Sequence, residues 1–178
     1  VKQKANQAQE KLEIARAKQI PFVLIVNYEA FWRDAMLKFL RSIEWDNLIL
    51  DESHKIKDHS GTASKSADKV AQKSKYRTGL TGTPMPHNAF DIFAQYKALD
   101  SGVYGRNYHR FKTRYGILDP YIPGRIIDLQ NQEEFKEKYH QISFRVTSDI
   151  LDLPEAIHTY RTCVLNSKTA KIYKDLDK

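Results

Sequence analysis

The sequence predicts an α/β domain built on a parallel sheet. Two short apolar runs, at 22–26 and 48–50, and a third predicted strand at 76–80 alternate with segments of helical character over the first hundred residues. Strands that alternate with helices are typical of parallel sheets, and continuous apolar runs are typical of strands buried on both faces. After Asp100 the chain becomes rich in glycine, tyrosine, arginine and proline, which predicts a helical and irregular C-terminal part.

Helices are expected between and after these strands. Residues 2–19 have sparse apolar positions, so a helix there is expected to pack weakly on the rest. The domain organisation that follows is an N-terminal helix at 1–20, a core at 21–100 and a closing part at 101–178. Further helices are predicted at 29–42, 62–73, 89–99, 108–115, 132–140 and 168–176, the last capped by Ser167, with strands at 142–145 and 157–165 and a helical turn at 146–153.

The composition excludes several classes of protein. The 178 residues are 41% hydrophobic and 29% charged, which fits one globular domain with a real core and excludes wholesale disorder. No apolar run approaches the ~20 residues of a membrane span. The single cysteine, Cys163, excludes an internal disulfide and fits a reducing compartment. Because the chain begins at Val1 and not at Met, we expect a piece of a longer or processed protein.

The net charge of +7 is unevenly distributed. Residues 55–77 carry seven basic and two acidic side chains, and residues 106–125 carry five basic and one acidic. Such clusters are the electrostatic footprint of a protein that binds a phosphate backbone, but they also occur on solvated helix faces. The tyrosines interleaved with arginines in the second cluster either stack on bases or pack within a loop-rich subdomain.

Polar residues follow each predicted strand of the core. These are Asn27-Tyr28-Glu29, Asp51-Glu52-Ser53-His54 and Thr81-Gly82-Thr83-Pro84. In an open α/β sheet, ligands bind outside the carboxyl ends of the strands. An aspartate at such an end suits a hydrated Mg²⁺ beside nucleotide phosphates, and an adjacent glutamate can activate water. The alternatives are a capped strand-end turn, or a metal centre at His54, Asp58 and His59, whose spacing matches no zinc signature.

These motifs resemble a known family. Residues 48–54 are similar to the Walker B box of helicase superfamily two, and residues 80–84 are similar to that superfamily's third motif. Flanking residues narrow the resemblance, over about 22–176, to the Swi/Snf-type double-stranded DNA translocases. These residues are Trp45, Lys55-Ile56-Lys57, Asn88 and the Asn27-Tyr28-Glu29 strand end.

The resemblance implies a fold, a chemistry and a set of site residues. The fold is a partial RecA-like parallel sheet flanked by helices, and the cofactors of the complete protein are ATP and Mg²⁺. By resemblance, Asp51 holds Mg²⁺ through water and Glu52 is the general base. The implied partner is double-stranded DNA. The resemblance also implies residues that couple ATP hydrolysis to nucleic-acid movement, namely His54, Thr81, Gly82, Thr83 and Asn88. It implies residues that contact nucleic acid, namely Asn27, Tyr28, Lys55 and Lys57.

Some of the family's parts are not found in these 178 residues. None of the seven glycines is followed by lysine, so the phosphate-cradling Walker A loop is absent. We expect a fragment of the first RecA-like lobe, without the Walker A segment and without the second lobe, that is inactive as an ATPase by itself. Without its usual neighbour, the strand at 76–80 should have an open edge that residues 1–19, or a second copy of the chain, cover.

A different function is also compatible with these patterns. A non-catalytic DNA-binding or partner-docking module, descended from such an ATPase, would keep the same motifs. In either case we expect an intracellular protein without a membrane partner, cytoplasmic or nucleoid-associated if it is bacterial or from a phage.

Overall fold

The computed structural model describes residues 2–146, 157, 159–162 and 164–176. The chain divides into two compact units, Val1–Ser143 and Phe144–Lys178, which are described separately. None of the helices in the described residues is long and apolar enough to cross a membrane.

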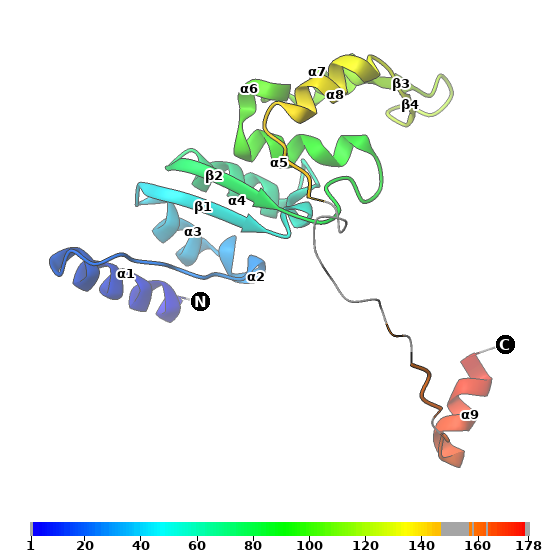
Figure 1. The fold of residues 1–178 in the computed structure, drawn as a ribbon, viewed down its shortest axis with the longest axis horizontal. Helices are drawn as coiled ribbons and strands as arrows, with labels where there is room; N and C mark the ends of the chain where they lie inside the picture. Colours follow the sequence, from blue (N-terminus) through cyan, green and yellow to red (C-terminus); the bar gives the residue numbers. More distant parts are fainter. Residues whose placement is uncertain (1, 147–156, 158, 163, 177–178) are drawn as a thin grey trace. The chain divides into compact units, whose positions relative to one another are not determined.

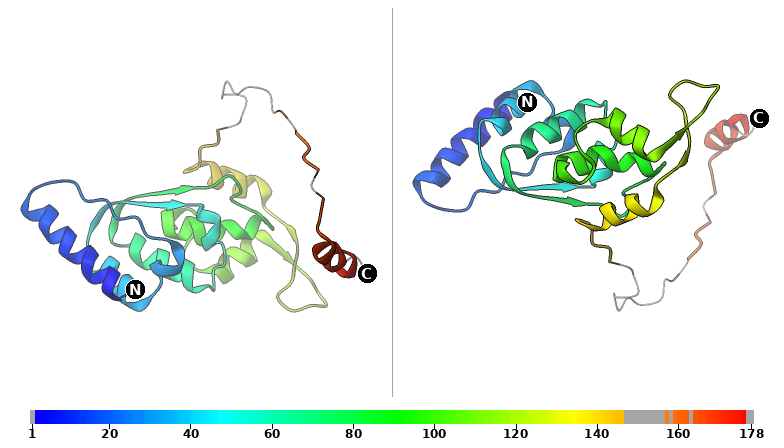
Figure 2. Two further views of the ribbon diagram at one scale, coloured as in Figure 1. Left: turned by 90° about the horizontal axis from the view of Figure 1, so that it is seen from below. Right: turned by 90° about the horizontal axis from the view of Figure 1, so that it is seen from above.

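The centre of the first unit is a parallel pair of strands, β1 (Trp45–Asp51) and β2 (Ser74–Leu80). Helices α4 (Thr62–Ala71) and α5 (Ile92–Leu99) both contact β2, and Figure 2 shows the strands along one side with these helices on the other. The opposite face of the pair is exposed, including Ile49, Tyr76 and Leu80. Burial on both faces is therefore wrong for the described part of this unit, because its helices cover one face only.

The apolar run at 22–26 is not a strand. Phe22, Leu24 and Val26 pack against the core, whereas Val23 and Ile25 are 81% and 92% exposed. This alternation is that of an extended segment covered on one side, but the run has no ladder partner among the described residues. The predicted strand at this position is therefore corrected to an irregular segment.

Two helices replace the single helix predicted at 29–42. They are α2 (Tyr28–Phe31) and α3 (Asp34–Arg41), separated at Arg33, whose ψ of 135° is extended. Asn27 begins α2, and its side chain accepts a hydrogen bond from the Ala30 amide at 3.0 Å. The break turns the chain so that the apolar side of α3, with Phe39 and Leu40, enters the core.

The N-terminal helix α1 (Lys2–Ala17) packs more closely than its sequence predicts. Ala5, Ala8 and Leu12 are buried in the same core as α3, which α1 contacts and beside which it lies in Figure 1. Small alanines let two helix backbones approach, so few apolar residues suffice. Helix α1 therefore covers α3 and not the edge of β2, so the prediction that residues 1–19 cover that edge is wrong.

An aromatic cluster forms a second core in the same unit. It belongs to η2 (Ala89–Asp91), α5, α6 (Ser101–Tyr104), α7 (Tyr108–Tyr115) and α8 (Gln132–His140). A hairpin of β3 (Gly116–Leu118) and β4 (Ile126–Leu129), which the sequence did not predict, joins α7 to α8. Tyr104 and Tyr115 are buried here, so packing is the correct interpretation for these two tyrosines. The members of the aromatic cluster are Phe90, Ile92, Phe93, Tyr96, Val103, Tyr104, Phe111, Tyr115 and Phe135.

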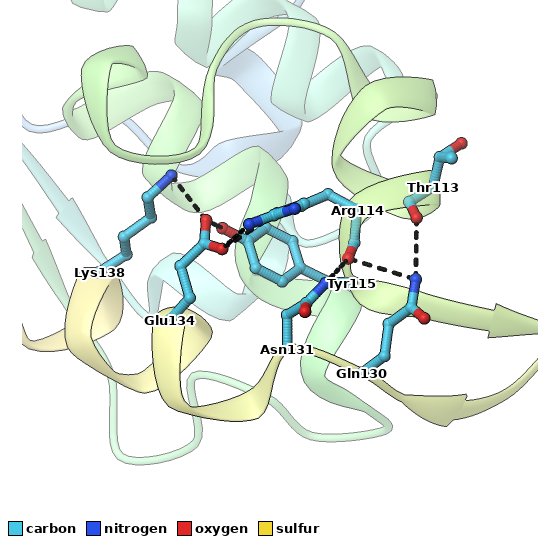
Figure 3. A network of polar contacts seen from close by, with 7 residues as sticks. All are labelled: Thr113, Arg114, Tyr115, Gln130, Asn131, Glu134 and Lys138. Carbon is cyan, nitrogen blue, oxygen red and sulfur yellow. Dashed lines mark hydrogen bonds and ion pairs between the residues drawn. The ribbon is translucent and has the colours of Figure 1, made fainter.

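Glu134 on α8 is the centre of a polar network beside this cluster (Figure 3). Its carboxylate accepts hydrogen bonds from Arg114, with Nε at 3.0 Å, and from the Tyr115 hydroxyl at 2.8 Å, and it pairs with Lys138 at 3.3 Å. The Arg114 hydrogen bond is the main reason that the pKa of Glu134 is lowered from 4.5 to about 2.

In the second unit the structure describes one helix, α9 (Ser167–Leu176). Its cap is Asn166, whose side chain accepts from the Thr169 amide at 2.9 Å, one residue before the predicted Ser167. No strand forms at 142–145, or among the described residues of 157–165, because these segments find no ladder partner there. All but the first residue of the turn predicted at 146–153 lies outside the described residues.

Candidate functional site

The parallel register brings the two central motifs to one edge of the sheet. Asp51 pairs with Leu80, so the residues that follow β1 and those that follow β2 emerge side by side. Figure 1 shows both strands pointing in the same direction. We refer to residues 51–54 and 81–84 as the strand-end site.

The acidic pair turns sharply at the end of β1. One oxygen of Asp51, Oδ1, accepts a hydrogen bond from the Glu52 amide at 3.0 Å. Glu52 has φ 51° and ψ 53°, a left-handed conformation that non-glycine residues rarely adopt. Strain of this kind concentrates at functional sites. The left-handed turn at Glu52 ends β1 and starts the short helix η1 (Ser53–Ile56). The Glu52 side chain is half-exposed at the rim of the sheet.

His54 connects the two motifs. Its Nδ1 lies 2.9 Å from Thr81 Oγ1 and 3.1 Å from Glu52 Oε2. A ring nitrogen either donates or accepts a hydrogen bond according to its protonation. When protonated, Nδ1 can donate to the Glu52 carboxylate; when unprotonated, it can only accept from the Thr81 hydroxyl. The same nitrogen is therefore shared between the acidic turn and the loop after β2.

A hydrogen bond within the loop after β2 holds its conformation. Thr81 Oγ1 accepts a hydrogen bond from the Thr83 amide at 3.1 Å, which leaves the Thr81 hydroxyl proton available to His54. A side chain added at Gly82 would meet nothing within 4 Å, so no steric need for glycine is evident there. Asn88 caps η2 by accepting from the Phe90 amide at 2.8 Å. Asn88 therefore fixes the beginning of the next helix, and among the described residues its side chain is not hydrogen-bonded to the loop itself.

Tyr28 lies beneath the acidic pair. Its hydroxyl donates to the Asp51 carbonyl oxygen at 2.8 Å, and Lys55 Nζ lies 5.7 Å from the centre of its ring. Burial, and then the charges of Asp51 and Glu52, raise the pKa of Tyr28 to about 12. The Tyr28 hydroxyl and the Asn27 side chain, which caps α2, are thus engaged within the protein, whereas Lys55 is exposed and Lys57 half-buried.

The donor set at the strand-end site fits a hydrated magnesium ion. Asp51 offers an exposed carboxylate, of which one oxygen accepts from a single amide. No cluster of three or more His, Cys, Asp or Glu side chains that could hold a metal occurs within the described residues. Mg²⁺ commonly takes one or two carboxylates and fills its shell with water and phosphate, so a single aspartate is a sufficient protein ligand.

Sequence reasoning missed two residues that meet at this site. Ser53 and Gln95 are both buried, and the Ser53 hydroxyl donates to Gln95 Oε1 at 2.8 Å. The available signal was a polar glutamine inside the otherwise apolar stretch Ile92-Phe93-Ala94-Gln95-Tyr96, because a buried amide requires a partner.

Comparison with known proteins shows the family to which the chain belongs. The model of the SNF2-related domain matches residues 1–178. This chain belongs to the SNF2-related domain family. Among its relatives are the human TATA-binding protein-associated factor 172, 26% identical over 167 residues, and the CHD3-type chromatin-remodeling factor PICKLE of Arabidopsis thaliana, 27% identical over 167 residues. These alignments cover 88% and 90% of this chain but only 9% and 11% of the relatives, so the chain spans about a tenth of their length.

A solved structure agrees with this assignment. The SNF2-related chain is similar to the Sulfolobus solfataricus SWI2/SNF2 ATPase core in complex with dsDNA, with a TM-score of 0.57 and 31% identity. The match covers 83% of this chain and 30% of the other. The fold predicted from sequence, a partial RecA-like parallel sheet flanked by helices, is thereby confirmed.

Proposed function

We propose that this SNF2-related chain supplies the Walker B and coupling segments of the first lobe of an ATP-dependent double-stranded DNA translocase. The observation that carries the proposal is His54 Nδ1, which lies within hydrogen-bond distance of both Glu52 and Thr81. A general base and a coupling loop need such a connection if hydrolysis is to depend on DNA. The similar ATPase core bound to dsDNA supports the choice of DNA as partner.

Five residues of the strand-end site have roles in this proposal. Mg-ATP, when bound, would supply the phosphoryl group and the divalent charge. Asp51 would hold the ion through water, and Glu52 would take a proton from the attacking water. His54 would then respond to the charge on Glu52 by changing the hydrogen bond that its Nδ1 makes with Thr81. The change at Thr81 would reach Thr83, because the Thr83 amide is bonded to Thr81 Oγ1.

The test is phosphate release by the complete protein with and without double-stranded DNA. Replacing a general base costs about 10²–10⁴-fold in rate, so Glu52→Gln should lose DNA-stimulated hydrolysis to that extent. The matched control is Glu44→Gln, at an exposed glutamate before β1, which should keep full activity. Equal rates for wild type and Glu52→Gln would contradict the proposal. DNA binding without any ATPase activity would instead favour the non-catalytic module.

The isolated 178-residue chain should release no phosphate. The phosphate-cradling loop and the arginine fingers of a second lobe are not among its residues, and an arginine finger alone is worth about 10³–10⁵ in rate. DNA-stimulated release by this chain, blocked by Glu52→Gln, would refute this expectation.

A further inference from the structure

A second polar connection, centred on the buried Gln95, runs beside the partly exposed His54–Thr81 contact at the strand-end site. Gln95 on α5 is 2% exposed and Ser53 is 3% exposed. Gln95 Oε1 accepts from the Ser53 hydroxyl at 2.8 Å. Gln95 Nε2 donates to the Pro84 carbonyl at 2.6 Å and to the Asp91 carbonyl at 3.0 Å. One amide therefore contacts the acidic turn, the loop after β2 and its own helix.

The orientation of this amide is fixed by its partners. The carbonyl oxygens of Pro84 and Asp91 can only accept hydrogen bonds, so they require the nitrogen of Gln95. Both N–H groups of this nitrogen are therefore used. The bond to Asp91, one helical turn earlier, holds the side chain against α5. The oxygen is then left for the Ser53 hydroxyl. A flipped amide would lose both bonds to the carbonyl oxygens, since it would place its own oxygen against theirs.

Ser53 is confined on its other side by Gly79 of β2. A methyl group added at Gly79 would lie 3.3 Å from both Cβ and Oγ of Ser53 and 3.0 Å from Leu99 Cδ1. The serine is thus enclosed between the strand and the glutamine. Water cannot easily replace either partner, so breaking this connection leaves buried polar groups unsatisfied.

We propose that Gln95 is a positioning residue that ties the Pro84 end of the loop after β2 to the acidic turn at Ser53. His54 and Thr81 are both partly exposed, so water can reach their contact, whereas the Ser53–Gln95 bond is buried. The loop is therefore fixed at Pro84 and free to respond at Thr81. This inference rests on the proposed function for its consequence, coupling to DNA, but its geometry can be tested without it.

The first measurement is amide hydrogen exchange of Gly82, Thr83 and Met85 in the complete protein. Ser53→Ala removes one bond of the connection and should raise their exchange about fivefold, the effect of one net hydrogen bond. Ser74→Ala is the matched control: this buried serine donates to the Val70 carbonyl at 3.0 Å at the opposite end of β2. It should leave exchange of the loop unchanged. Unchanged exchange in Ser53→Ala, or an equal rise in both variants, would overturn the proposal.

The second measurement is the ratio of DNA-stimulated to basal ATPase activity. Ser53→Ala should lower this ratio about fivefold, because the released loop weakens the response to DNA more than it weakens basal hydrolysis. Gln95→Met, which breaks all three bonds, should lower it further if the variant folds. Equal losses in both rates would indicate a merely structural role and would overturn the proposal. If wild type hydrolyses no ATP, the proposed function fails, and the exchange measurement still decides the role of Gln95.

Discussion

The strand-end site and the aromatic cluster differ in how many contacts hold each side chain. At the strand-end site, His54 and Thr81 meet through one hydrogen bond at the rim of the sheet. Within the aromatic cluster, the Phe111 ring has five aromatic neighbours, with centroids between 5.0 and 6.3 Å away. Side chains held by few contacts can change partners at little cost, whereas those held by many cannot. We therefore expect the side chains of the strand-end site to move and those of the aromatic cluster to support the fold.

The largest effect on stability should come from the aromatic cluster. Phe111→Ala removes a fully buried ring and should lower the free energy of unfolding by about 3–5 kcal/mol. Denaturant unfolding followed by circular dichroism measures this loss. Tyr121→Ala, at an exposed tyrosine of the hairpin loop, is the control and should change stability by less than about 0.5 kcal/mol. Equal effects would mean that the cluster is not the support inferred here.

Asp68 of α4 connects the sheet core to the segment that carries the aromatic cluster. Its nearly buried carboxylate accepts two hydrogen bonds from Arg106, at 2.8 and 2.9 Å, and lies 3.5 Å from Lys97. Asp68→Asn should cost about 1–3 kcal/mol in thermal or denaturant unfolding, less than for a fully buried pair because Arg106 is half-exposed. The exposed Asp46→Asn serves as the control. A loss no larger than that of the control would show that the ion pair does not join the two regions.

Local patterns predicted the elements whose stability is mainly local. Helices at 108–115 and 132–140 were predicted with the bounds that the structure has, and the pairing of strand ends brought Asp51 and Thr81 to one edge as the α/β pattern required. These features depend on apolar periodicity and on the direction of parallel strands, both of which are written in short windows of sequence.

Features that depend on a distant partner were missed. The run at 22–26 has the composition of a strand, but a strand exists only where a neighbour supplies hydrogen bonds. The β3–β4 hairpin is short and pairs across a long loop, so neither half is recognisable alone. Gln95 looked like an ordinary position in a helix because its partners, Ser53 and Pro84, are 42 and 11 residues away.

A smaller effect on stability, and a larger one on function, is expected at Thr81. Thr81→Val removes the hydroxyl that His54 contacts and should change the free energy of unfolding by about 1 kcal/mol at most, since the residue is only partly buried. The nitrogen chemical shift of His54 Nδ1 should nevertheless change, because this atom loses a hydrogen-bond partner. Thr81→Ser keeps the hydroxyl and should restore the wild-type shift. Identical Nδ1 shifts in Thr81→Val and wild type would separate His54 from the coupling loop.

The smallest effect is expected from Glu134, which supports the aromatic cluster from outside. Its pKa is about 2 in the folded protein, below the ordinary value of 4.5, because Arg114 and Tyr115 bond to the ionised form. The unfolded chain therefore binds this proton first as the pH falls, so the contribution of Glu134 is complete above pH 4.5 and is lost between about 4.5 and about 2. The unfolding midpoint of wild type should approach that of Glu134→Gln over this range. Glu133→Gln, at an exposed neighbour whose ion pair within the described part of the chain is with Lys136, should run parallel to wild type. Glu134 is only partly buried, so solvent screens its charge and the difference should shrink further in high salt. A difference that survives both acid and salt would mean that packing, and not charge, is what Glu134 contributes.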